Sequence, residues 1–435
     1  MQESIITTGL NFYPYGGEFF ITHPIEIMTP IFLLLVIFLL LNTETIAKSF
    51  SKIDKKTWAV LLMIFLAGFW LRNAEYRYGG GVDGFIYLNS AKYMLEKDIQ
   101  VWSCAVGNDD KCYLYNQHLA PAGYPYLIFL AFLFFGEHDM YAMMISGILG
   151  SLTILIIFLF TYLFFKEKRI GLYAAAVFAV IPLDIYLTPT GAVRTASLFF
   201  IISIMTIFLI AIRKDRLLLW NLFAIIFSYT LYVRQENVLL LFPMAAIFII
   251  EKRIRLNNLK TTNWSKLIKK YWIPLAIFFI TQIPLQHWVL LAPHKSSGWI
   301  VPANLPLMSY MNLYSFFLNP LGVESLYNPI LSAMFFLSAL LLLKKTHRKQ
   351  ILVMWLWFMP LLVLHSVYYE GCQGIPPEQC LTYIRLMQHF HIPYSILAGA
   401  LLFRIENLTK VRKKITTPIV IVFIFSSTFS LIDCS

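Results

Sequence analysis

The chain has 435 residues, of which 59% are hydrophobic and only 13% are charged. Soluble domains carry roughly a quarter charged residues, so this composition excludes a soluble globular protein and indicates an integral membrane protein. The net charge is +12, but Lys and Arg collect in the cytoplasmic loops of membrane proteins, and no basic helix with interleaved aromatic residues points to nucleic acid. We expect one membrane domain over residues 1–435, without a separate soluble domain.

Apolar segments of membrane-spanning length follow one another along the chain, since a bilayer core takes about 20 apolar residues per helix. They predict an all-α, polytopic protein with about 12 spans. The predicted spans are 25–41, 57–72, 140–165, 170–187, 193–212, 216–232, 235–250, 272–291, 328–343, 350–368, 386–403 and 416–432. The first is expected to remain as an anchor, because the residues before it lack the basic start of a cleaved signal peptide.

The apolar segment 121–136 is shorter than the others. We expect a juxtamembrane helix there, lying at the outer surface within the large outer loop 73–139. A full span at 121–136 is the alternative, although it would break the alternation of the basic loops.

Basic residues occupy every second predicted loop, for example Lys48–Lys56, Lys166–Arg169 and Arg213–Arg216. The positive-inside rule orients these loops towards the cytoplasm. The segments 73–139, 292–327 and 369–385 and both termini then face outward, in a multi-pass protein of the plasma membrane.

Four of the five cysteines form two local pairs in these outer segments, namely Cys104 with Cys112 and Cys372 with Cys380. Disulfides persist only in oxidising compartments, so two local pairs on the outer side favour two disulfide bonds. Four free thiols are the alternative.

Ionisable residues gather at the predicted outer ends of the spans, where charge is costly to keep. This set consists of Asp83, Asp184, Arg194, Arg234, Glu236, Arg385, His389 and His391. Outer arginines run against the positive-inside trend, and an Arg fork suits an anionic phosphate. For each Arg taken alone, snorkelling to the interface is an equal alternative. We interpret the histidines as polar lining and do not expect a metal site.

Several short motifs follow one another over residues 57–403. Asp83 and Tyr87 lie in GGGVDGFIYLNSAKYML (79–95), and HLAPAGYPYLIFLAFLFFG (118–136) begins at His118. Next come KEKR (166–169), AVIPLDIYL (179–187), the turn Arg234–Glu236 and RLMQHFHIP (385–393). In this order they resemble GT-C glycosyltransferases, in particular the polyprenyl-phosphate-sugar branch that includes protein O-mannosyltransferases and the aminoarabinose transferase acting on lipid A.

The resemblance implies an inverting hexosyl- or pentosyltransferase without a cofactor or metal. Its donor would be a sugar on polyprenyl or dolichyl phosphate, and its acceptor a hydroxyl on a glycan, lipid or protein at the outer face. Asp83 would be the general base. The other matching positions would contact substrate, namely Tyr87, His118, Asp184, Arg194, Arg234, Glu236, Arg385 and His389.

The chain departs from this pattern at one position next to the acid. Many relatives carry Asp-Glu in the first outer loop, whereas Gly84 follows Asp83 here. The second acid is therefore missing or comes from elsewhere, such as Glu75 or Asp184. Asp83 as a helix cap is the alternative to catalysis. A lipid-linked glycan polymerase or ligase and a secondary transporter are the alternative functions.

Overall fold

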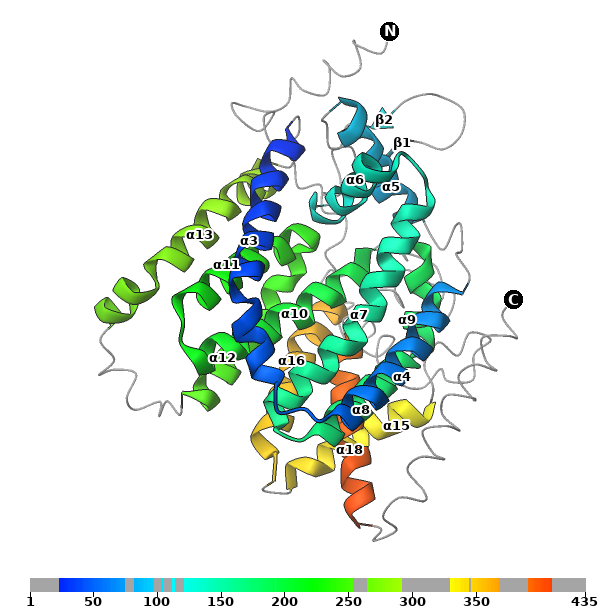
Figure 1. Cartoon of the computed structure of the whole chain (residues 1–435), viewed down its shortest axis with the longest axis vertical. Coiled ribbons are helices and arrows are strands. Elements are labelled where there is room, and N and C mark those ends of the chain that lie inside the picture. Colours follow the sequence, from blue (N-terminus) through cyan, green and yellow to red (C-terminus); the bar gives the residue numbers. More distant parts are fainter. Residues whose placement is uncertain are drawn as a thin grey trace.

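The computed structural model describes residues 23–74, 82–97, 103–104, 112–113, 121–191, 193–252, 264–291, 329–343, 346–367 and 390–408. Its elements are α3 (Pro24–Phe50), α4 (Lys55–Asn73), α5 (Val82–Lys97), β1 (Ser103–Cys104), β2 (Cys112–Tyr113), α6 (Gly123–Phe135), α7 (Met140–Phe165), α8 (Lys168–Ala179), α9 (Pro182–Leu187), η1 (Thr188–Thr190), α10 (Val193–Lys214), α11 (Leu217–Val233), η2 (Gln235–Leu240), α12 (Leu241–Glu251), α13 (Trp264–Leu291), α15 (Pro329–Leu337), η5 (Ser338–Leu343), α16 (Arg348–Val367) and α18 (His391–Leu408). The part of the chain that is described is therefore mostly helical, as predicted, with one two-stranded hairpin (Figure 1).

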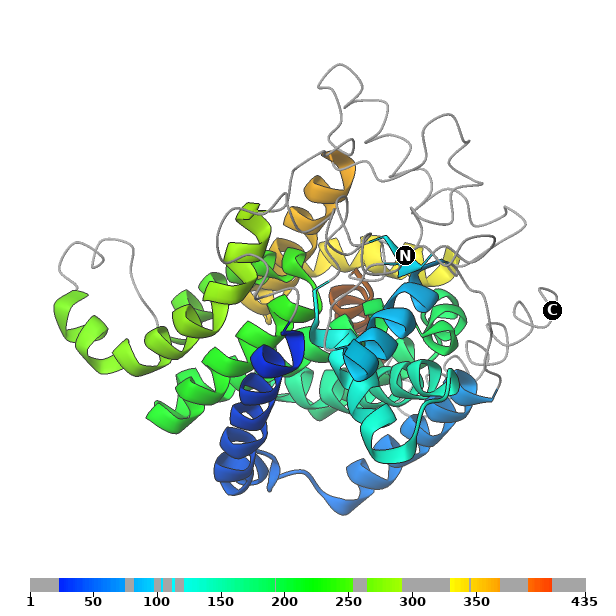
Figure 2. The same cartoon turned by 90° about the horizontal axis from the view of Figure 1, so that it is seen from above.

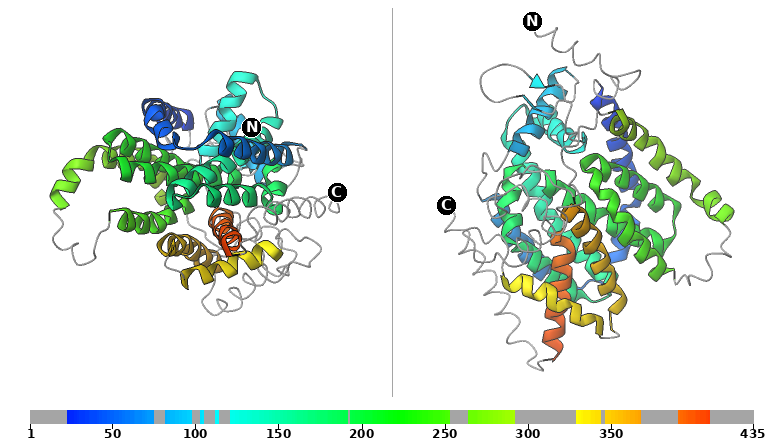
Figure 3. Two further views of the ribbon diagram at one scale, coloured as in Figure 1. Left: turned by 60° about the horizontal axis from the view of Figure 1, so that its bottom comes forward. Right: turned by 180° about the vertical axis from the view of Figure 1, so that it is seen from behind.

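The core of the bundle lies around α10, whose residues from Val193 to Ile212 are almost all buried. A helix that is apolar on all sides and buried on all sides belongs at the centre of a helical membrane protein. It packs on α7 and α11, and α7 packs in turn on α4 and α8. The C-terminal helices α15, α16 and α18 lie together on one side of the bundle, where α18 packs on α8 (Figure 3).

Three described helices, α3, α7 and α10, are long and apolar enough to cross a membrane. Helix α8 with α9 and η1 makes a fourth if this pair, bent by 55°, counts as one span. The predicted count of about 12 is not confirmed, and the last predicted span, 416–432, lies outside the described residues. Helix α6 has 13 residues, or about 20 Å, which favours a juxtamembrane helix over a full span at 121–136.

The predicted span 170–187 is not one continuous helix but a bent pair of helices. It breaks after Ala179, and α9 starts at Pro182. Proline has no N–H to continue the hydrogen-bond ladder, and it pushes the residue before it out of the helical region. Ile181 accordingly has extended backbone angles, with φ −67° and ψ 116°.

The helix ends next to the predicted basic loops, where the structure describes them, gather at one end of the bundle, at the bottom of Figure 1. Lys168, at the start of α8, pairs with Asp54 between α3 and α4, and Arg169 pairs with Glu406 near the end of α18. The turn before α11 is joined to the end of α3, where Arg216 Nη1 donates to Thr45 Oγ1 at 3.0 Å, and to α13, where Lys270 Nζ lies 2.5 Å from Asp215. These contacts agree with the alternation of loops along the sequence.

The hairpin formed by β1 and β2 bears on the first predicted disulfide. The strands are antiparallel, and the register sets Cys104 directly opposite Cys112. Residues that face each other in this way have Cβ atoms about 4.5–5.5 Å apart, close to the separation that a disulfide requires. The pair Cys372 and Cys380 lies outside the described residues.

We predict that Cys104 and Cys112 are bonded and that the bond stabilises the fold by about 2–3 kcal/mol, because it closes a short loop in the unfolded chain. Mass spectrometry of peptides prepared without reduction is expected to show the linked pair. Alkylation of both thiols before reduction would contradict the prediction.

Candidate functional site at the end opposite the basic loops

The helix that carries the predicted acid begins at the end of the bundle opposite the basic loops. Asp83 is the second residue of α5 and so does not occupy the N-cap position itself. The next residue, Gly84, lies against the backbone of η1: a Cβ at this position would be 2.6 Å from the carbonyl oxygen of Thr190. This close approach gives a physical reason for a glycine at the position where the resemblance predicts a second acid.

Helix α6 holds α5 against the bundle. Tyr87 of α5 packs on Tyr124 of α6, with the ring centroids 5.5 Å apart and the rings edge to face. Tyr124 is fully buried and donates a hydrogen bond to the carbonyl oxygen of Ala142 on α7 at 2.9 Å. Viewed from above, α5 and α6 lie over the ends of the bundle helices (Figure 2). Tyr87 therefore has a packing role in addition to the predicted substrate contact.

Ion pairs also join the later part of α5 to the turn before α7. Lys92 Nζ lies 3.0 Å from Glu137 and 2.9 Å from Asp139. Burial alone would lower the pKa of Lys92, but hydrogen bonds to the two carboxylates raise it. Lys92 therefore stays charged at neutral pH, and the ion pairs persist.

The start of α6 also reaches the turn that carries the predicted phosphate ligand. Gly123 packs so closely on the end of α11 that a Cβ would lie 2.7 Å from the carbonyl oxygen of Tyr232. The carbonyl oxygen of Gly123 accepts a hydrogen bond from Tyr229 Oη at 2.8 Å. Arg234 follows immediately after α11, so this contact brings the first outer loop next to the Arg234 turn.

Arg234 and Glu236 form a bidentate ion pair within this turn. Arg234 Nε donates to Glu236 Oε2 at 3.3 Å, and Nη2 donates to Oε1 at 2.6 Å. The Arg234 side chain is mostly buried, whereas the Glu236 side chain is more exposed. The Arg234 guanidinium is held on one side by the Glu236 carboxylate and so has a fixed orientation, which suits the recognition of an anion.

Arg194 belongs to the same end of the bundle. It lies in the first turn of α10, is buried, and has interactions with its surroundings. Ser197, one turn further along α10, and Asn237 exchange hydrogen bonds at 3.1 and 3.2 Å. Because Asn237 lies three residues after Arg234, Arg194 and Arg234 lie on or next to elements in direct contact, and α5 also contacts α10.

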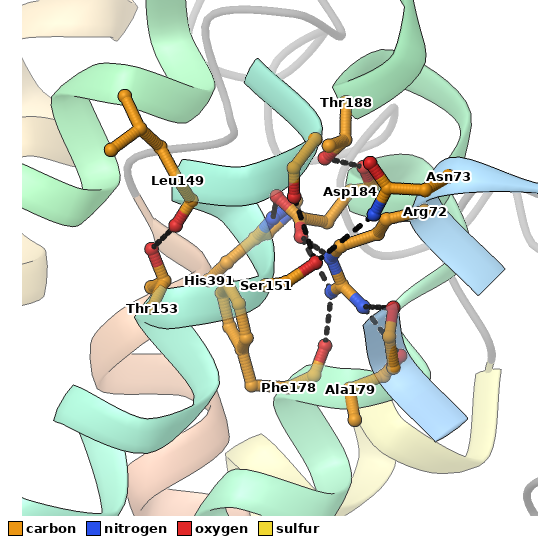
Figure 4. A network of polar contacts seen from close by, with 12 residues as sticks. Arg72, Asn73, Leu149, Ser151, Thr153, Phe178, Ala179, Asp184, Thr188 and His391 are labelled. Carbon is orange, nitrogen blue, oxygen red and sulfur yellow. Dashed lines mark hydrogen bonds and ion pairs between the residues drawn. The ribbon is translucent and has the colours of Figure 1, made fainter. Parts of the chain in front are cut away.

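The most heavily bonded polar group at this end is one that the sequence interpretation missed. Arg72, on the last turn of α4, is fully buried and forms an ion pair with the fully buried Asp184 of α9 (Figure 4). Nη2 lies 2.6 Å and Nε 3.1 Å from Asp184 Oδ2. His391, the first residue of α18, places Nδ1 3.8 Å from Asp184 Oδ1. Arg72 also lies at the predicted outer end of its span, against the charge rule, which is the signal that could have identified it.

The structure thus brings together most of the predicted residues that it describes. Asp83, Tyr87, Arg194, Arg234 and Glu236 belong to contacting elements at one end. Asp184 belongs to the same end, but its carboxylate is enclosed by Arg72 and His391. The predicted residues His118, Arg385 and His389, and the possible second acid Glu75, lie outside the described residues.

Comparison with known families matches residues 120–288 to the family of dolichyl-phosphate-mannose-protein mannosyltransferases. This range runs from the start of α6 to the later part of α13 and includes Asp184, Arg194 and Arg234. Comparison with curated proteins finds no match.

Among solved structures, the chain is similar to the oligosaccharyltransferase of Archaeoglobus fulgidus. The match to its apo form has 15% identity and a TM-score of 0.51, covering 87% of this chain and 55% of the other. Its complex with Zn and sulfate matches with 14% identity and a TM-score of 0.52, covering 85% and 52%. ArnT from Cupriavidus metallidurans bound to undecaprenyl phosphate follows with 13% identity and a TM-score of 0.49, covering 80% and 59%.

The chain therefore spans about half the length of the solved structures that it matches. At these identities the likeness concerns the fold alone, and the family match covers less than half of the chain. Together with the family match, it confirms the resemblance to GT-C glycosyltransferases of the polyprenyl-phosphate-sugar branch that the ordered motifs indicate.

Proposed function

We propose that the chain is an integral membrane glycosyltransferase. It moves a sugar from a polyprenyl or dolichyl phosphate carrier to an acceptor hydroxyl at the outer face. The observation that supports this most is the packing of α5, whose second residue is Asp83, on α10, which carries Arg194, and on α6. Helix α6 in turn contacts the end of α11, next to Arg234. The family match over residues 120–288 supports the same donor class.

In the proposed reaction Asp83 accepts the proton of the acceptor hydroxyl as its oxygen attacks the anomeric carbon. The bond from this carbon to the phosphate oxygen breaks at the same time, and the lipid phosphate leaves. A single displacement inverts the anomeric centre. Because the leaving group already carries negative charge, nearby arginines stabilise the charge that develops on it.

We assign Arg234 to the donor phosphate, with Glu236 fixing the orientation of its guanidinium. Arg194, at the start of the neighbouring α10, adds positive charge at the same end. Arg385 and His389 complete the proposed set of substrate contacts, together with Tyr87 and His118. The acceptor hydroxyl belongs to a glycan, a lipid or a protein.

The test uses the purified chain in lipid nanodiscs with short-chain polyprenyl-phosphate sugars, each labelled in the sugar. We expect at least one of them to bind, and an acceptor from a panel of glycans, lipids and peptides to take up the label as lipid phosphate is released. Absence of both binding and transfer across the donor panel would reject the proposal.

We predict that Arg234→Ala weakens donor binding roughly 10- to 100-fold and lowers turnover as well, since a hydrogen-bonded charge contact is lost. Arg234→Lys should recover only part of the affinity, because a point charge replaces a fork of donors. Donor affinity is measured by displacement of a labelled lipid phosphate. The exposed Lys252 provides a control: Lys252→Ala should bind the donor like the parent, and equal binding by Arg234→Ala would remove Arg234 from the phosphate site.

The proposed outer face is open to a separate prediction. Cysteines introduced at the exposed Glu137 and Lys168 should be labelled from opposite sides of the membrane in intact cells, Glu137→Cys from outside and Lys168→Cys only after permeabilisation. The parent chain gives the background from its native thiols. Labelling of Lys168→Cys from outside would contradict the proposed orientation of the chain in the membrane.

A further inference from the structure

We propose that Arg72 and Asp184 are positioning residues for the Asp83 site. Their buried ion pair fixes the outer segment α9–η1, and the start of α5 is seated on that segment. This inference rests on the proposed function, because it takes Asp83 as the base. It assigns Asp184 to the placement of the acid instead of to direct substrate contact.

The first step of the argument is the set of contacts that Arg72 makes. Besides Asp184 it bonds to three carbonyl oxygens, those of Gly68 at 3.2 Å, Ala179 at 2.9 Å and Phe178 at 2.9 Å. All five N–H groups of the guanidinium are thereby used. One side chain thus joins the outer end of α4 to both sides of the break between α8 and α9 (Figure 4).

The second step concerns the break itself. A helix that ends inside a protein leaves its last carbonyl groups without partners in the helix, and each buried one needs another donor. Arg72 supplies donors to Phe178 and Ala179, the last two residues of α8. Its ion pair with Asp184 then fixes the first turn of α9 on the other side of the break. Removal of Arg72 would leave both carbonyls and a buried carboxylate without this donor.

The third step leads from α9 to the acid. Thr188 Oγ1 donates to the carbonyl oxygen of Asp184 at 2.5 Å, which ties η1 to α9. Thr190, two residues later, presents the carbonyl oxygen on which Gly84 is seated. Asp83 is the neighbour of Gly84 in α5. The chain of contacts from Arg72 to the acid is therefore continuous, and a shift of α9–η1 displaces the base.

The experiment compares two double variants in the transfer assay. Arg72→Met with Asp184→Leu removes both charges of the pair and leaves neither buried alone, so the protein should still fold. The control, Arg213→Met with Glu251→Leu, removes the ion pair at the opposite end of the bundle. There Arg213, like Arg72, donates from Nε and Nη2 to one carboxylate, at 3.0 and 2.6 Å, and it also bonds a helix carbonyl, that of Leu163 at 2.7 Å.

We expect the Arg72–Asp184 double variant to keep its donor affinity and thermal stability near those of the control but to lose roughly 10- to 100-fold in kcat, because a displacement of about 1 Å has effects of this size. Amide hydrogen exchange should become faster in the first turns of α5, and only in this variant. Gly84→Ala should lower kcat in the same way with the ion pair intact, since its Cβ pushes α5 away from Thr190.

Two outcomes separate the inference from the proposed function. In the first outcome, the Arg72–Asp184 double variant has the kcat of the parent and the amide exchange of the parent in α5, while Asp83→Asn is inactive. This result would overturn the positioning role alone. Turnover of Asp83→Asn at the parental rate would overturn the role of Asp83 in the proposed function. The exchange rates in α5 would still show whether the ion pair holds this helix, since they do not depend on activity.

Discussion

Asp83→Asn is expected to lower turnover by roughly 10²–10⁴-fold, the usual contribution of general base catalysis, with donor affinity almost unchanged. The amide has nearly the size of the carboxylate but cannot take the proton of the acceptor hydroxyl. The measurement is sugar transfer from a short-chain lipid-phosphate donor at saturating concentration, with donor binding measured separately.

Glu96→Gln provides the matched control, because Glu96 is an exposed acid on the same helix, α5. It should turn over like the parent. If Asp83→Asn also does so, the acid only stabilises the first turn of α5, where a negative charge is favoured by the helix dipole.

Arg72→Ala should destabilise the folded protein by about 3–5 kcal/mol, because it leaves Asp184 as an uncompensated charge in the interior. The free energy of unfolding, measured in mixed micelles with increasing SDS, tests this value. Adding Asp184→Leu to Arg72→Ala should recover a large part of the loss, since no charge is then buried alone.

The comparison for this prediction is Lys168→Ala, which breaks the exposed ion pair with Asp54 at the other end of the bundle. Exposed pairs contribute little, so this variant should unfold almost like the parent. Equal effects of Arg72→Ala and Lys168→Ala would mean that the buried pair does not stabilise the fold.

Several helices could be predicted closely from the sequence because their ends carry local signals. Helix α7 has the predicted bounds 140–165, since charged residues flank an unbroken apolar segment on both sides. Helices α4, α10 and α11 agree with their predicted spans within a few residues for the same reason. The break in 170–187 was also marked locally by Pro182, but apolarity alone gave one continuous span there.

The site was predictable to the extent that topology alone sets its residues at one end. The alternation of basic loops placed Asp83, Arg194 and Arg234 together without any knowledge of packing. The sequence could not indicate that Asp184 forms an ion pair with Arg72, because the partners lie 112 residues apart. Nor could it show that Gly84 lies against Thr190. Both contacts depend on how α4, α5 and α9 pack, and local patterns do not record that.

The buried cluster at the outer end also sets an order of events during synthesis. Arg72 emerges 112 residues before Asp184, so α4 must wait with its arginine at the polar membrane surface until the break between α8 and α9 arrives. His391 reaches the cluster only when α18 has been inserted, well after Asp184. Contacts between such distant parts of a chain form slowly. The cluster is therefore complete only after α18 has been inserted, and an early nascent chain carries its acid without a finished site around it.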